Sequence, residues 1–175
     1  MSALDRTPEN LNFLNTYGYQ VLIKKLPYVK YFTQKFEHPG CSIPSTSQPN
    51  PFTSIPHSGE HILYEPLTVD FKVDEDMKNY IEVYNWLRGL GFPDNFEEHK
   101  ALTEMPVGER ICSDISIIAL TNVKNPNIMI TYRDAFPVSI SRLYFSTTEN
   151  DVVSLNCQVT FEYTLYDIED LPVQT

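Results

Sequence analysis

The sequence predicts a mainly β fold, a sandwich or barrel with one α-helix packed on its apolar side. Apolar and polar residues alternate without interruption over residues 152–166, and shorter segments elsewhere show the same period of two. Only residues 75–90 show the spacing of an amphipathic helix. A chain in which strands greatly outnumber helices is typical of packed sheets or closed barrels.

Composition is that of a globular chain with a core of its own. The 175 residues are 42% hydrophobic and 13% aromatic, which is enough for one domain. A net charge of −10 with only 13 Lys and Arg residues disfavours binding to nucleic acid, because neutralising phosphates requires clustered basic residues. The sequence therefore argues against a DNA-gripping protein.

The cysteines and the hydropathy pattern bear on the compartment. Cys41, Cys112 and Cys157 are widely spaced and odd in number, which fits neither a closed disulfide set nor paired zinc ligands. A reducing compartment is the simpler interpretation. The sequence has neither the pattern of a signal peptide nor a run of about 18 apolar residues, so we expect no membrane insertion.

The first part of the chain predicts an arm followed by two short strands. Residues 1–16 are polar and mixed, and we expect them to form a loosely held N-terminal arm. Residues 18–25 and 31–37 predict strands on either side of a turn at Leu26 and Pro27.

A proline-rich segment follows at residues 39–56. Its five prolines exclude a helix and an interior strand. A loop of this length inside a domain is usually functional or disordered. A purely solvated linker would have no need of Ile43, Phe52 and Ile55, so we interpret the segment as an extended arm that lies against another surface, such as a neighbouring chain. A disordered excursion is the alternative.

The helix predicted over residues 75–90 follows a strand over 67–73, and Asp74 is expected to cap it. Its apolar surface is wider than the stripe of about 100° that a one-sided helix needs. The face expected to pack on the sheet contains Met77, Tyr80, Ile81, Tyr84 and Leu87. Val83, Trp86 and Leu90 widen it, which indicates that either the domain's own loops or an adjoining subunit cover the second side.

The second half of the chain predicts mostly strands. After a polar stretch at 94–110, residues 111–120 and 127–134 predict a hairpin around residues 123–126. A short crossing leads to the strand over 152–166. At a rise of about 3.3 Å per residue this strand would be roughly 50 Å long, which is typical of a tall wall or barrel.

No residue set indicates a catalytic, metal or cofactor site. His57 and His61 have the i, i+4 spacing of zinc-binding helices, but Pro56 and Gly59 disfavour a helix there. The sequence also contains no phosphate-binding glycine loop before a helix and no GxSxG nucleophile elbow. We therefore expect no cofactor and no enzymatic activity.

The order of these segments resembles the tail tube protein family of contractile-tailed bacteriophages. The most specific pieces are the strand-to-helix junction LTVDFKVDEDMKNYIEVYNWL, the segment DAFPVSIS, and the alternating strand near the C-terminus. Together they cover roughly residues 17–168, which would be the tail tube domain with its proline-rich arm at 39–56. Residues 169–175 would form a C-terminal tail.

The resemblance implies a structural protein of the virion, in the phage tail. Members of the family stack as hexameric rings into a hollow tube, and strands of neighbouring subunits join into one continuous barrel around the lumen. Baseplate proteins that initiate the tube and secretion-system tube proteins are similar in fold. The implied partners are further copies of the chain, the sheath, and the baseplate and tail-terminator proteins, while double-stranded DNA passes through without specific binding.

The polar face of the long strand is the expected lumen wall. It lacks Lys and Arg, and acidic charge would keep DNA away over a Debye length of about 10 Å. The expected lumen-facing residues are Ser154, Asn156, Gln158, Thr160, Glu162 and Thr164. The expected contacts between subunits are Ile43, Phe52, Ile55, Val83, Trp86 and Leu90.

Three alternatives to a repeated tube subunit remain open at this point. A baseplate or tube-junction protein that initiates or caps the tube would have the same domain, although such proteins often carry additional segments. A small-molecule-binding barrel would have alternating strands around an apolar cavity. An enzyme that uses His57 and His61 on a metal is the third.

Overall fold

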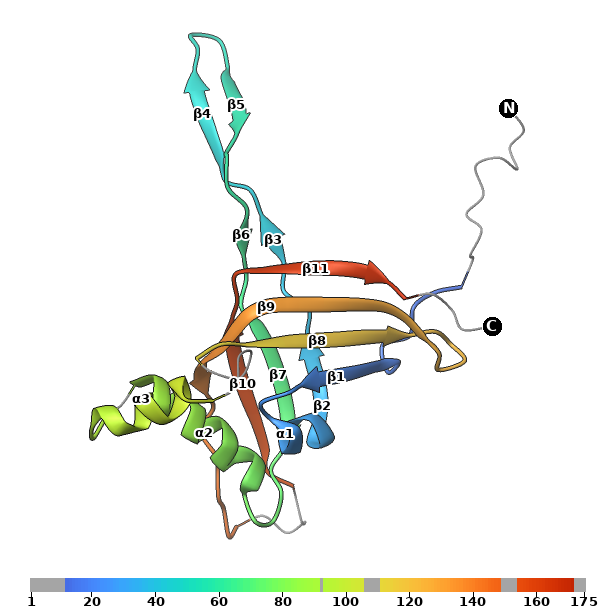
Figure 1. Ribbon diagram of the computed structural model, residues 1–175. Coiled ribbons are helices and arrows are strands. Elements are labelled where there is room, and N and C mark those ends of the chain that lie inside the picture. The colour runs from blue at the N-terminus through green and yellow to red at the C-terminus, as the bar shows by residue number, and fades with distance from the viewer. Residues whose placement is uncertain (1–11, 92, 106–110, 149–153, 172–175) are drawn as a thin grey trace.

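Within residues 12–91, 93–105, 111–148 and 154–171, which the computed structural model describes, a seven-stranded antiparallel sheet folds into two layers (Figure 1). Residues 1–11 of the predicted N-terminal arm (1–16) and residues 172–175 of the predicted C-terminal tail (169–175) lie outside the described residues. The strands of the two layers are β1 (Tyr19–Ile23), β2 (Thr33–Glu37), β7 (Leu67–Lys72), β8 (Ser113–Leu120), β9 (Pro126–Ile140), β10 (Asn156–Glu162) and β11 (Leu165–Asp170). The remaining elements are α1 (Pro27–Phe32), α2 (Lys78–Gly91), α3 (Phe96–Thr103), β3 (Cys41–Ser42), β4 (Ser45–Pro49), β5 (Ser54–Ser58) and β6 (Leu63–Tyr64).

Strand β9 belongs to both layers. Its first part pairs with β8 and β11, and its second part pairs with β10. We call β1, β8, the first part of β9 and β11 sheet A, and the second part of β9, β10, β7 and β2 sheet B. In Figure 1 the strands of sheet A run across the view, and β2, β7 and β10 run in a different direction behind or below them.

The chain changes layer at Asp134. This residue has a left-handed φ of 54°, and the register shifts around it, so that two residues of β9 oppose Asp114 of β8. An extra residue of this kind bends a strand and increases its twist. Strand β9 is therefore longer than the predicted strand over 127–134, because it turns the corner and continues as far as Ile140.

The prediction of one uninterrupted strand over residues 152–166 is wrong. The segment forms β10 in sheet B and β11 in sheet A, with a break at Tyr163 and Thr164, and residues 149–153 lie outside the described part. At the break the N–H of Thr164 donates to the carbonyl of Arg133, 3.0 Å away. The break also changes the phase of the alternation, because Tyr166 lies opposite the buried Tyr132 whereas Leu165 lies opposite Arg133 on the other face.

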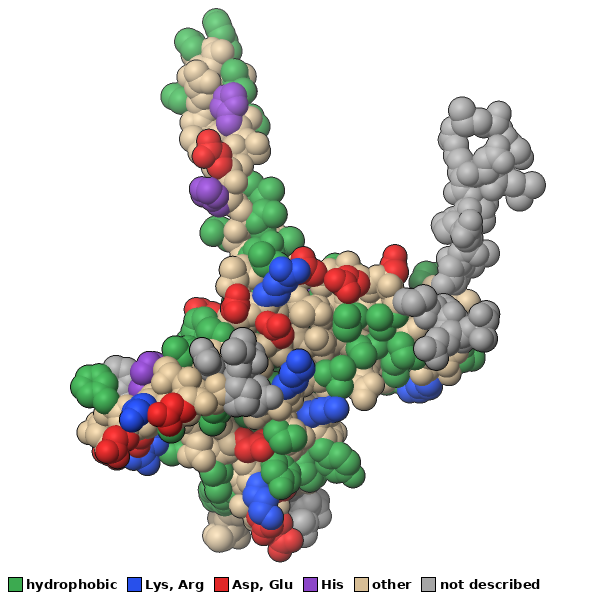
Figure 2. Space-filling model, in the orientation of Figure 1, with side chains coloured by type: hydrophobic (Ala, Val, Ile, Leu, Met, Phe, Trp, Pro, Cys, Tyr) green, Lys and Arg blue, Asp and Glu red, His purple; other side chains and the backbone are tan. Residues whose placement is uncertain are grey.

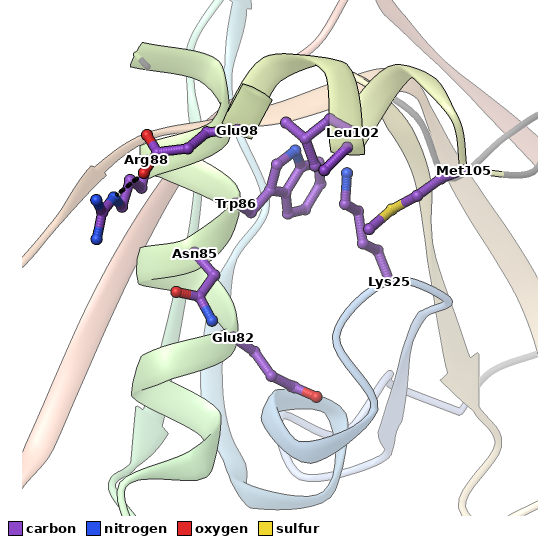
Figure 3. Close-up of a pocket in the computed structure, with 10 residues that line it drawn as sticks. Lys25, Glu82, Asn85, Trp86, Arg88, Glu98, Leu102 and Met105 are labelled. Carbon is purple, nitrogen blue, oxygen red and sulfur yellow. Dashed lines mark ion pairs between the residues drawn. The ribbon is translucent and has the colours of Figure 1, made fainter. Parts of the chain in front are cut away.

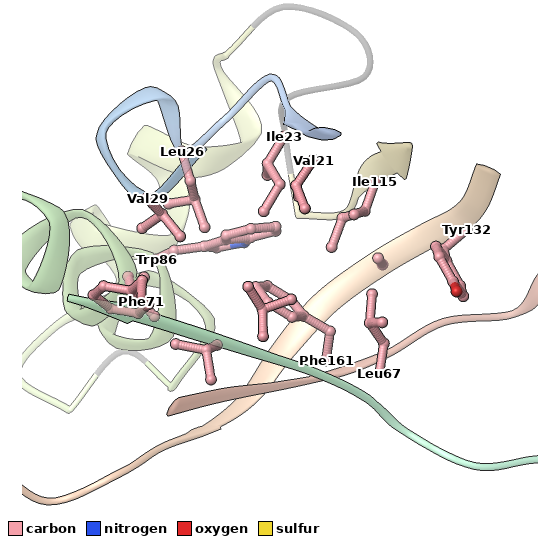
Figure 4. Packing of buried hydrophobic residues seen from close by; sticks show 14 of the residues in the cluster. Val21, Ile23, Leu26, Val29, Leu67, Phe71, Trp86, Ile115, Tyr132 and Phe161 are labelled. Atoms are coloured by element: carbon pink, nitrogen blue, oxygen red, sulfur yellow. The ribbon is translucent and has the colours of Figure 1, made fainter. Parts of the chain in front are cut away.

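The core lies between the two layers (Figure 4). Sheet A contributes Val21, Ile23, Ile115, Ile117 and Tyr132, and sheet B contributes Leu67, Val69, Phe71, Cys157, Val159 and Phe161. Trp86 of α2 closes one end, with its ring 6.1 Å from that of Phe161 and its Nε1 donating to the carbonyl of Ile111. The predicted mainly β sandwich is confirmed, whereas the described residues do not close into a barrel.

Two helices lie where the sequence predicted none. Pro27 begins α1, where its fixed φ suits the first helical position. Val29 is the residue of this helix that is buried in the core. Helix α1 therefore takes the first residues of the predicted strand over 31–37. Asn95 caps α3 by accepting from the N–H of Glu97. The pattern of Asn95 followed three residues later by Glu98 is the signature of a helix start and could have revealed α3.

Helix α2 begins three residues later than predicted. Met77 has a left-handed φ of 55°, which interrupts the helix before Lys78. Asp74 still serves this end, because its Oδ1 accepts from the N–H of Lys78 at 2.9 Å. Asn79 is fully buried and donates to the carbonyl of Lys72 at 2.7 Å, which fixes the helix to the end of β7.

Candidate assembly surfaces

The exposed face of sheet B contains the predicted lumen residues of β10. Asn156, Gln158 and Glu162 are exposed and Thr160 is half-buried, while the residues between them are buried. Ser154 precedes β10 and Thr164 lies in the break after it, and both are exposed. The in-and-out pattern predicted for this strand is present, although only four of the six residues lie within β10.

Neighbouring strands bring charges to this face that the sequence pattern did not reveal. Asp70 of β7 lies opposite Gln158, and Lys35 of β2 lies opposite Asp70. Lys72 lies opposite Asn156. The polar face of β10 itself contains no Lys or Arg, but Lys35 and Lys72 of the neighbouring strands share the face of sheet B with it. The face therefore has mixed charge.

These side chains surround a shallow hollow of about 480 Å³ in the face of sheet B. Lys35 forms an ion pair with Glu37 at 2.5 Å, which raises the pKa of Lys35 through the hydrogen bond and the charge of Glu37. Both side chains are more than half exposed, so the pair contributes little to stability. Charged and amide side chains lie beside the apolar Phe71 and Cys157 in its lining, so the hollow is mixed in character.

The proline-rich segment forms a projecting hairpin rather than a disordered loop. Strands β3 and β6 pair at its base, and β4 and β5 pair above them, from Ser45 opposite Ser58 to Pro49 opposite Ser54. We call residues 41–64 the hairpin arm. Both of its upper strands are edges, which is why proline is tolerated in each of them. Figure 1 shows the arm extending away from the two layers.

The hairpin arm continues the edge of sheet B. Strands β2 and β7 pair up to Glu37, and the N–H of Glu65 then donates to the carbonyl of Gly40 at 3.0 Å. Farther out, the N–H of Gly59 donates to the carbonyl of Pro44 at 2.7 Å. A Cβ at Gly59 would lie only 2.4 Å from that carbonyl oxygen, so the approach requires glycine. The arm therefore extends the β2–β7 hairpin along the strand direction.

The surface of the hairpin arm is almost uncharged and combines neutral polar residues with exposed apolar ones. Phe52 at the tip is 96% exposed, and Ile43 and Ile55 are exposed as well. Glu60 is the one Asp, Glu, Lys or Arg residue in the arm. Figure 2 shows hydrophobic and neutral side chains along most of it. Such a surface favours contact with another protein by burial of apolar groups rather than by ion pairs.

Several strand edges remain open in the described part of the chain. Strands β1, β2 and β11 each pair with one neighbour, and the second part of β9 pairs only with β10. Open edges present unpaired main-chain groups that can pair with another chain.

Two of the predicted contact residues on α2 lie inside the subunit. Val83 is 0% exposed and Trp86 is 1% exposed, and Leu90 is half-buried. The chain itself covers the second side of the helix: α3 packs so closely that a Cβ at Gly89 would lie 2.5 Å from Leu102. Val83 and Trp86 are therefore core residues. The expectation that Ile81 and Tyr84 pack on the sheet is wrong, because both are 47% exposed and the helix packs inward through Val83 and Trp86 instead.

A pocket of about 420 Å³ lies between α2 and α3 (Figure 3). Trp86, Leu102 and Met105 line it, and Lys25 lies over the Trp86 ring, 4.4 Å from its centre. An ion pair between Arg88 and Glu98 at 2.5 Å borders it. The pocket lies outside the two layers, whereas the space between the layers is filled by the core. This arrangement differs from the central cavity of a small-molecule-binding barrel.

The histidines considered for zinc lie on the hairpin arm. His57 is in β5, with its Nε2 3.1 Å from Oε1 of Gln48, and His61 lies just before β6. Across the described ranges, no group of three His, Cys, Asp or Glu side chains is arranged to hold a metal ion. The same ranges contain no helix of the length and apolarity needed to cross a bilayer.

Sequence comparison assigns the chain to a known family. The profile of the phage tail tube protein family matches residues 4–169. The chain belongs to this family. The tail tube terminator protein of Enterobacteria phage T4 is 29% identical over 166 residues, which cover 90% of each protein. The resemblance predicted from the sequence is thus confirmed.

Solved structures show the same fold. The cap that terminates the tube of the anti-feeding prophage has a TM-score of 0.64 at 14% identity and covers 98% of this chain and 100% of its own. A chain of the anti-feeding prophage baseplate has a TM-score of 0.60 at 11% identity and covers 89% and 93%. A chain of the sheath/tube terminator of an extracellular contractile injection system has a TM-score of 0.55 at 14% identity and covers 91% and 99%.

Membership of the tail tube family makes this chain a structural component of a phage tail, and so of the virion. Its relatives are tube and terminator proteins rather than enzymes. The prediction of a structural role in the tail tube is confirmed, while the relative from phage T4 is named a tube terminator rather than a repeated tube subunit.

Proposed function

We propose that this protein forms a terminator ring that caps the tail tube, rather than a subunit repeated along it. The observation that supports this most is the alignment with the T4 tail tube terminator over 90% of both chains. The solved cap with a TM-score of 0.64 covers the whole fold, including the region of the hairpin arm. The protein's partners would be the tube and sheath proteins at that end of the tail.

The open edges of sheet B support a ring of identical copies. Its strand order, β9-β10-β7-β2, is antiparallel throughout. The second part of β9 in one copy would therefore lie antiparallel to β2 of the next, as a regular ladder requires. A ring removes exposed edges and uses one head-to-tail contact throughout. A hexameric ring of this kind would make sheet B a continuous wall.

The exposed face of sheet B would line the bore of this ring. Ser154, Asn156, Gln158, Thr160, Glu162 and Thr164 are the proposed lumen residues, joined by Lys35, Asp70 and Lys72 from the neighbouring strands. Hydroxyl and amide groups with interspersed charges of both signs offer no cluster of cations to the phosphates of DNA. Double-stranded DNA would thus pass without being held.

The hairpin arm would make the axial contact with the last ring of the tube. Because it extends sheet B along the strand direction, it would leave the ring on the tube side and lie on the adjacent subunit. Ile43, Phe52 and Ile55 are the proposed contact residues. Its prolines restrict the free arm, so less conformational entropy is lost when it docks.

Copy number distinguishes a terminator from a tube subunit. Tails purified from wild-type phage and from mutants with longer and shorter tails should be analysed by quantitative mass spectrometry and by cryo-electron microscopy. We expect one ring of this chain at one end of each tail, in a number independent of tail length. A number that increases in proportion to tail length would instead identify the repeated tube subunit. Addition of the purified protein to growing tubes should stop elongation.

A further inference from the structure

Five aromatic side chains meet at the base of the hairpin arm. We call His38, Tyr64, Tyr132, Tyr163 and Tyr166 the aromatic cluster. The ring centres of Tyr132 and Tyr163 are 5.0 Å apart, and those of Tyr64 and Tyr166 are 5.4 Å apart. Separations and tilts of this kind are the favourable edge-to-face arrangements of aromatic rings.

The cluster joins elements that are distant in the sequence. Tyr64 belongs to β6 of the arm, and His38 precedes its first strand. Tyr132 lies in β9 beside the corner, Tyr163 lies in the break between β10 and β11, and Tyr166 lies in β11. The rings therefore connect the root of the arm with the point where the chain changes layer.

Polar contacts attach both strands at the base of the arm, near Cys41 and Glu65, to the same cluster; we call this base the arm root. On the first strand, Tyr166 Oη donates to Sγ of Cys41 at 3.7 Å. On the second strand, Tyr163 Oη donates to the carbonyl of Glu65 at 2.9 Å. Burial, followed by the neighbouring Tyr166 and Tyr64, raises the pKa of Tyr163 to about 12. The phenol is therefore a donor at neutral pH.

His38 completes the attachment on the first strand. Its Nδ1 is 2.7 Å from Oη of Tyr132. Burial lowers the pKa of His38 and raises that of Tyr132. A neutral imidazole and a protonated phenol result, and one hydrogen bond joins Nδ1 of His38 to Oη of Tyr132. The residue that leads into the arm is thus held against the core strand β9.

Within the described part of the chain, the arm has no comparable support above its root. Strands β4 and β5 are exposed at every position and pair only with each other. An isolated two-stranded hairpin is marginally stable in water and cannot fix its own direction relative to the body. The direction of the arm must therefore be set where it meets the two layers.

We infer that the aromatic cluster fixes the direction of the hairpin arm, with Tyr64 and Tyr166 as its main positioning residues. This inference rests on the proposed function only in assuming that the arm docks on the tube and must therefore be held in one direction. A preorganised arm loses less freedom on docking than a swinging one. The same cluster includes Tyr166 of the open edge strand β11, so the arm and that edge form one rigid unit.

The test measures arm direction without reference to capping. Spin labels on noncanonical amino acids at Gln20 of β1 and Thr46 of β4 leave the native cysteines in place. Labelled full-length protein is diluted with unlabelled protein, and pulsed electron spin resonance gives the distance distribution between the labels. We expect one narrow distribution in the wild type. In Tyr64→Ala/Tyr166→Ala, we expect its width to at least double.

Two further variants make the result specific. Tyr144→Ala removes an exposed tyrosine outside the cluster and should leave the width unchanged. Circular dichroism shows whether the double variant folds. If it does not, the width of the distance distribution is measured in Tyr64→Leu and Tyr166→Leu, which retain apolar volume but lose the aromatic ring and the hydroxyl group. A wild-type distribution that is already broad, or a narrow one in folded cluster variants, would overturn the inference.

The outcome can be separated from the proposed function. A broadened arm together with lost tube capping supports both proposals. A broadened arm with unchanged capping supports the positioning role of the cluster and contradicts the role of the arm in docking. A narrow distribution in the variants with lost capping overturns the cluster inference while leaving the terminator proposal in place.

Discussion

The main-chain N–H of Asp134 donates a hydrogen bond to Oδ1 of Asp114, 3.1 Å away, at the corner where β9 passes from sheet A to sheet B. Asp134 has a left-handed φ there, a conformation that aspartate tolerates better than most residues. The bulge leaves the N–H of Asp134 in β9 without a main-chain partner, and the carboxylate of Asp114 in β8 accepts its hydrogen bond instead. The corner depends on both residues.

Substitution at this corner should affect stability in a residue-specific way. A β-branched side chain is strongly disfavoured at positive φ, so Asp134→Val should lower the free energy of unfolding by about 1–3 kcal/mol. Asp134→Gly removes the conformational strain and should have a much smaller effect. Urea denaturation of both variants measures the difference. Equal losses in the two variants would contradict the assignment of strain to this φ.

Shortening the hairpin arm should separate folding from assembly. Excision of residues 46–57, with an Asn-Gly turn between Ser45 and Ser58, removes exposed residues that pair only with one another. We expect the free energy of unfolding to change by less than about 1 kcal/mol, while capping of tubes is lost. Sedimentation and tube-length measurements detect the loss.

A point substitution in the arm and a change of salt concentration test the same contact without shortening the chain. Phe52→Ser should weaken capping without affecting stability, because the side chain is 96% exposed. Capping by the wild type should vary little between low and high salt, since ion pairs contribute little to the contact. Normal capping by the shortened protein would assign the arm another role.

Trp86 should report the core rather than a subunit interface. Because the side chain is 1% exposed, its fluorescence should be shifted to the blue and protected from acrylamide in unassembled protein. Trp86→Ala should lower the free energy of unfolding by about 3–5 kcal/mol. Phe96→Ala, at a ring that is 75% exposed, is the matched control and should have little effect. Strong quenching that disappears only on assembly would restore the interface interpretation.

Added cations on the face of sheet B should retard DNA if this face lines the bore. Gln158→Lys with Glu162→Lys would place a ring of positive charge against the phosphates, and ejection should slow by about tenfold or more at low salt, less at high salt. Gln20→Lys with Glu104→Lys makes the same change of charge elsewhere and should leave ejection unaltered. Unchanged kinetics in virions that contain the first pair would refute the lumen assignment.

The stability of the arm root should decrease at mildly acidic pH. Burial lowers the pKa of His38 in the folded protein below its value of about 6.5 in an unfolded chain. As the pH falls below that unfolded value, the unfolded state binds a proton that the folded state takes up less readily, so stability falls. The groups that face His38, Tyr132 and Tyr166, stay neutral in this range.

The comparison variant for this effect is His38→Gln, which keeps a polar group but does not titrate. We expect the difference in free energy of unfolding between wild type and variant to shrink as the pH falls from 7.5 to about 5.5. Denaturation at several pH values measures it. A difference that stays constant would show that His38 does not change its protonation on unfolding.

Local patterns predicted a large part of this molecule. The alternation in residues 156–162 and 67–72 placed each side chain on its face, because successive residues of a strand point to opposite sides whatever the partner strand is. Proline content indicated an extended arm without interior strands. The capping pattern at Asn95 was equally local, and α3 could have been predicted from it.

The break at Tyr163 and Thr164 could not be predicted from the same alternation, because the change of face after it depends on the pairing of Tyr166 with Tyr132 of β9. Whether Val83 and Trp86 face another subunit or the chain's own core also depends on what packs over α2. The aromatic cluster combines His38 with Tyr166, which local spacing does not relate.

By itself the sequence determined the inward and outward faces of the strands, the extended character of the arm and the family. Only the tertiary structure decided where β9 turns its corner, which charges share a face with Gln158, and which rings hold the arm. The physical reason is that strand neighbours and ring contacts are chosen by the packing of two layers against one core. That packing joins residues far apart in the chain, whereas a periodic pattern records only what each residue's nearest neighbours require.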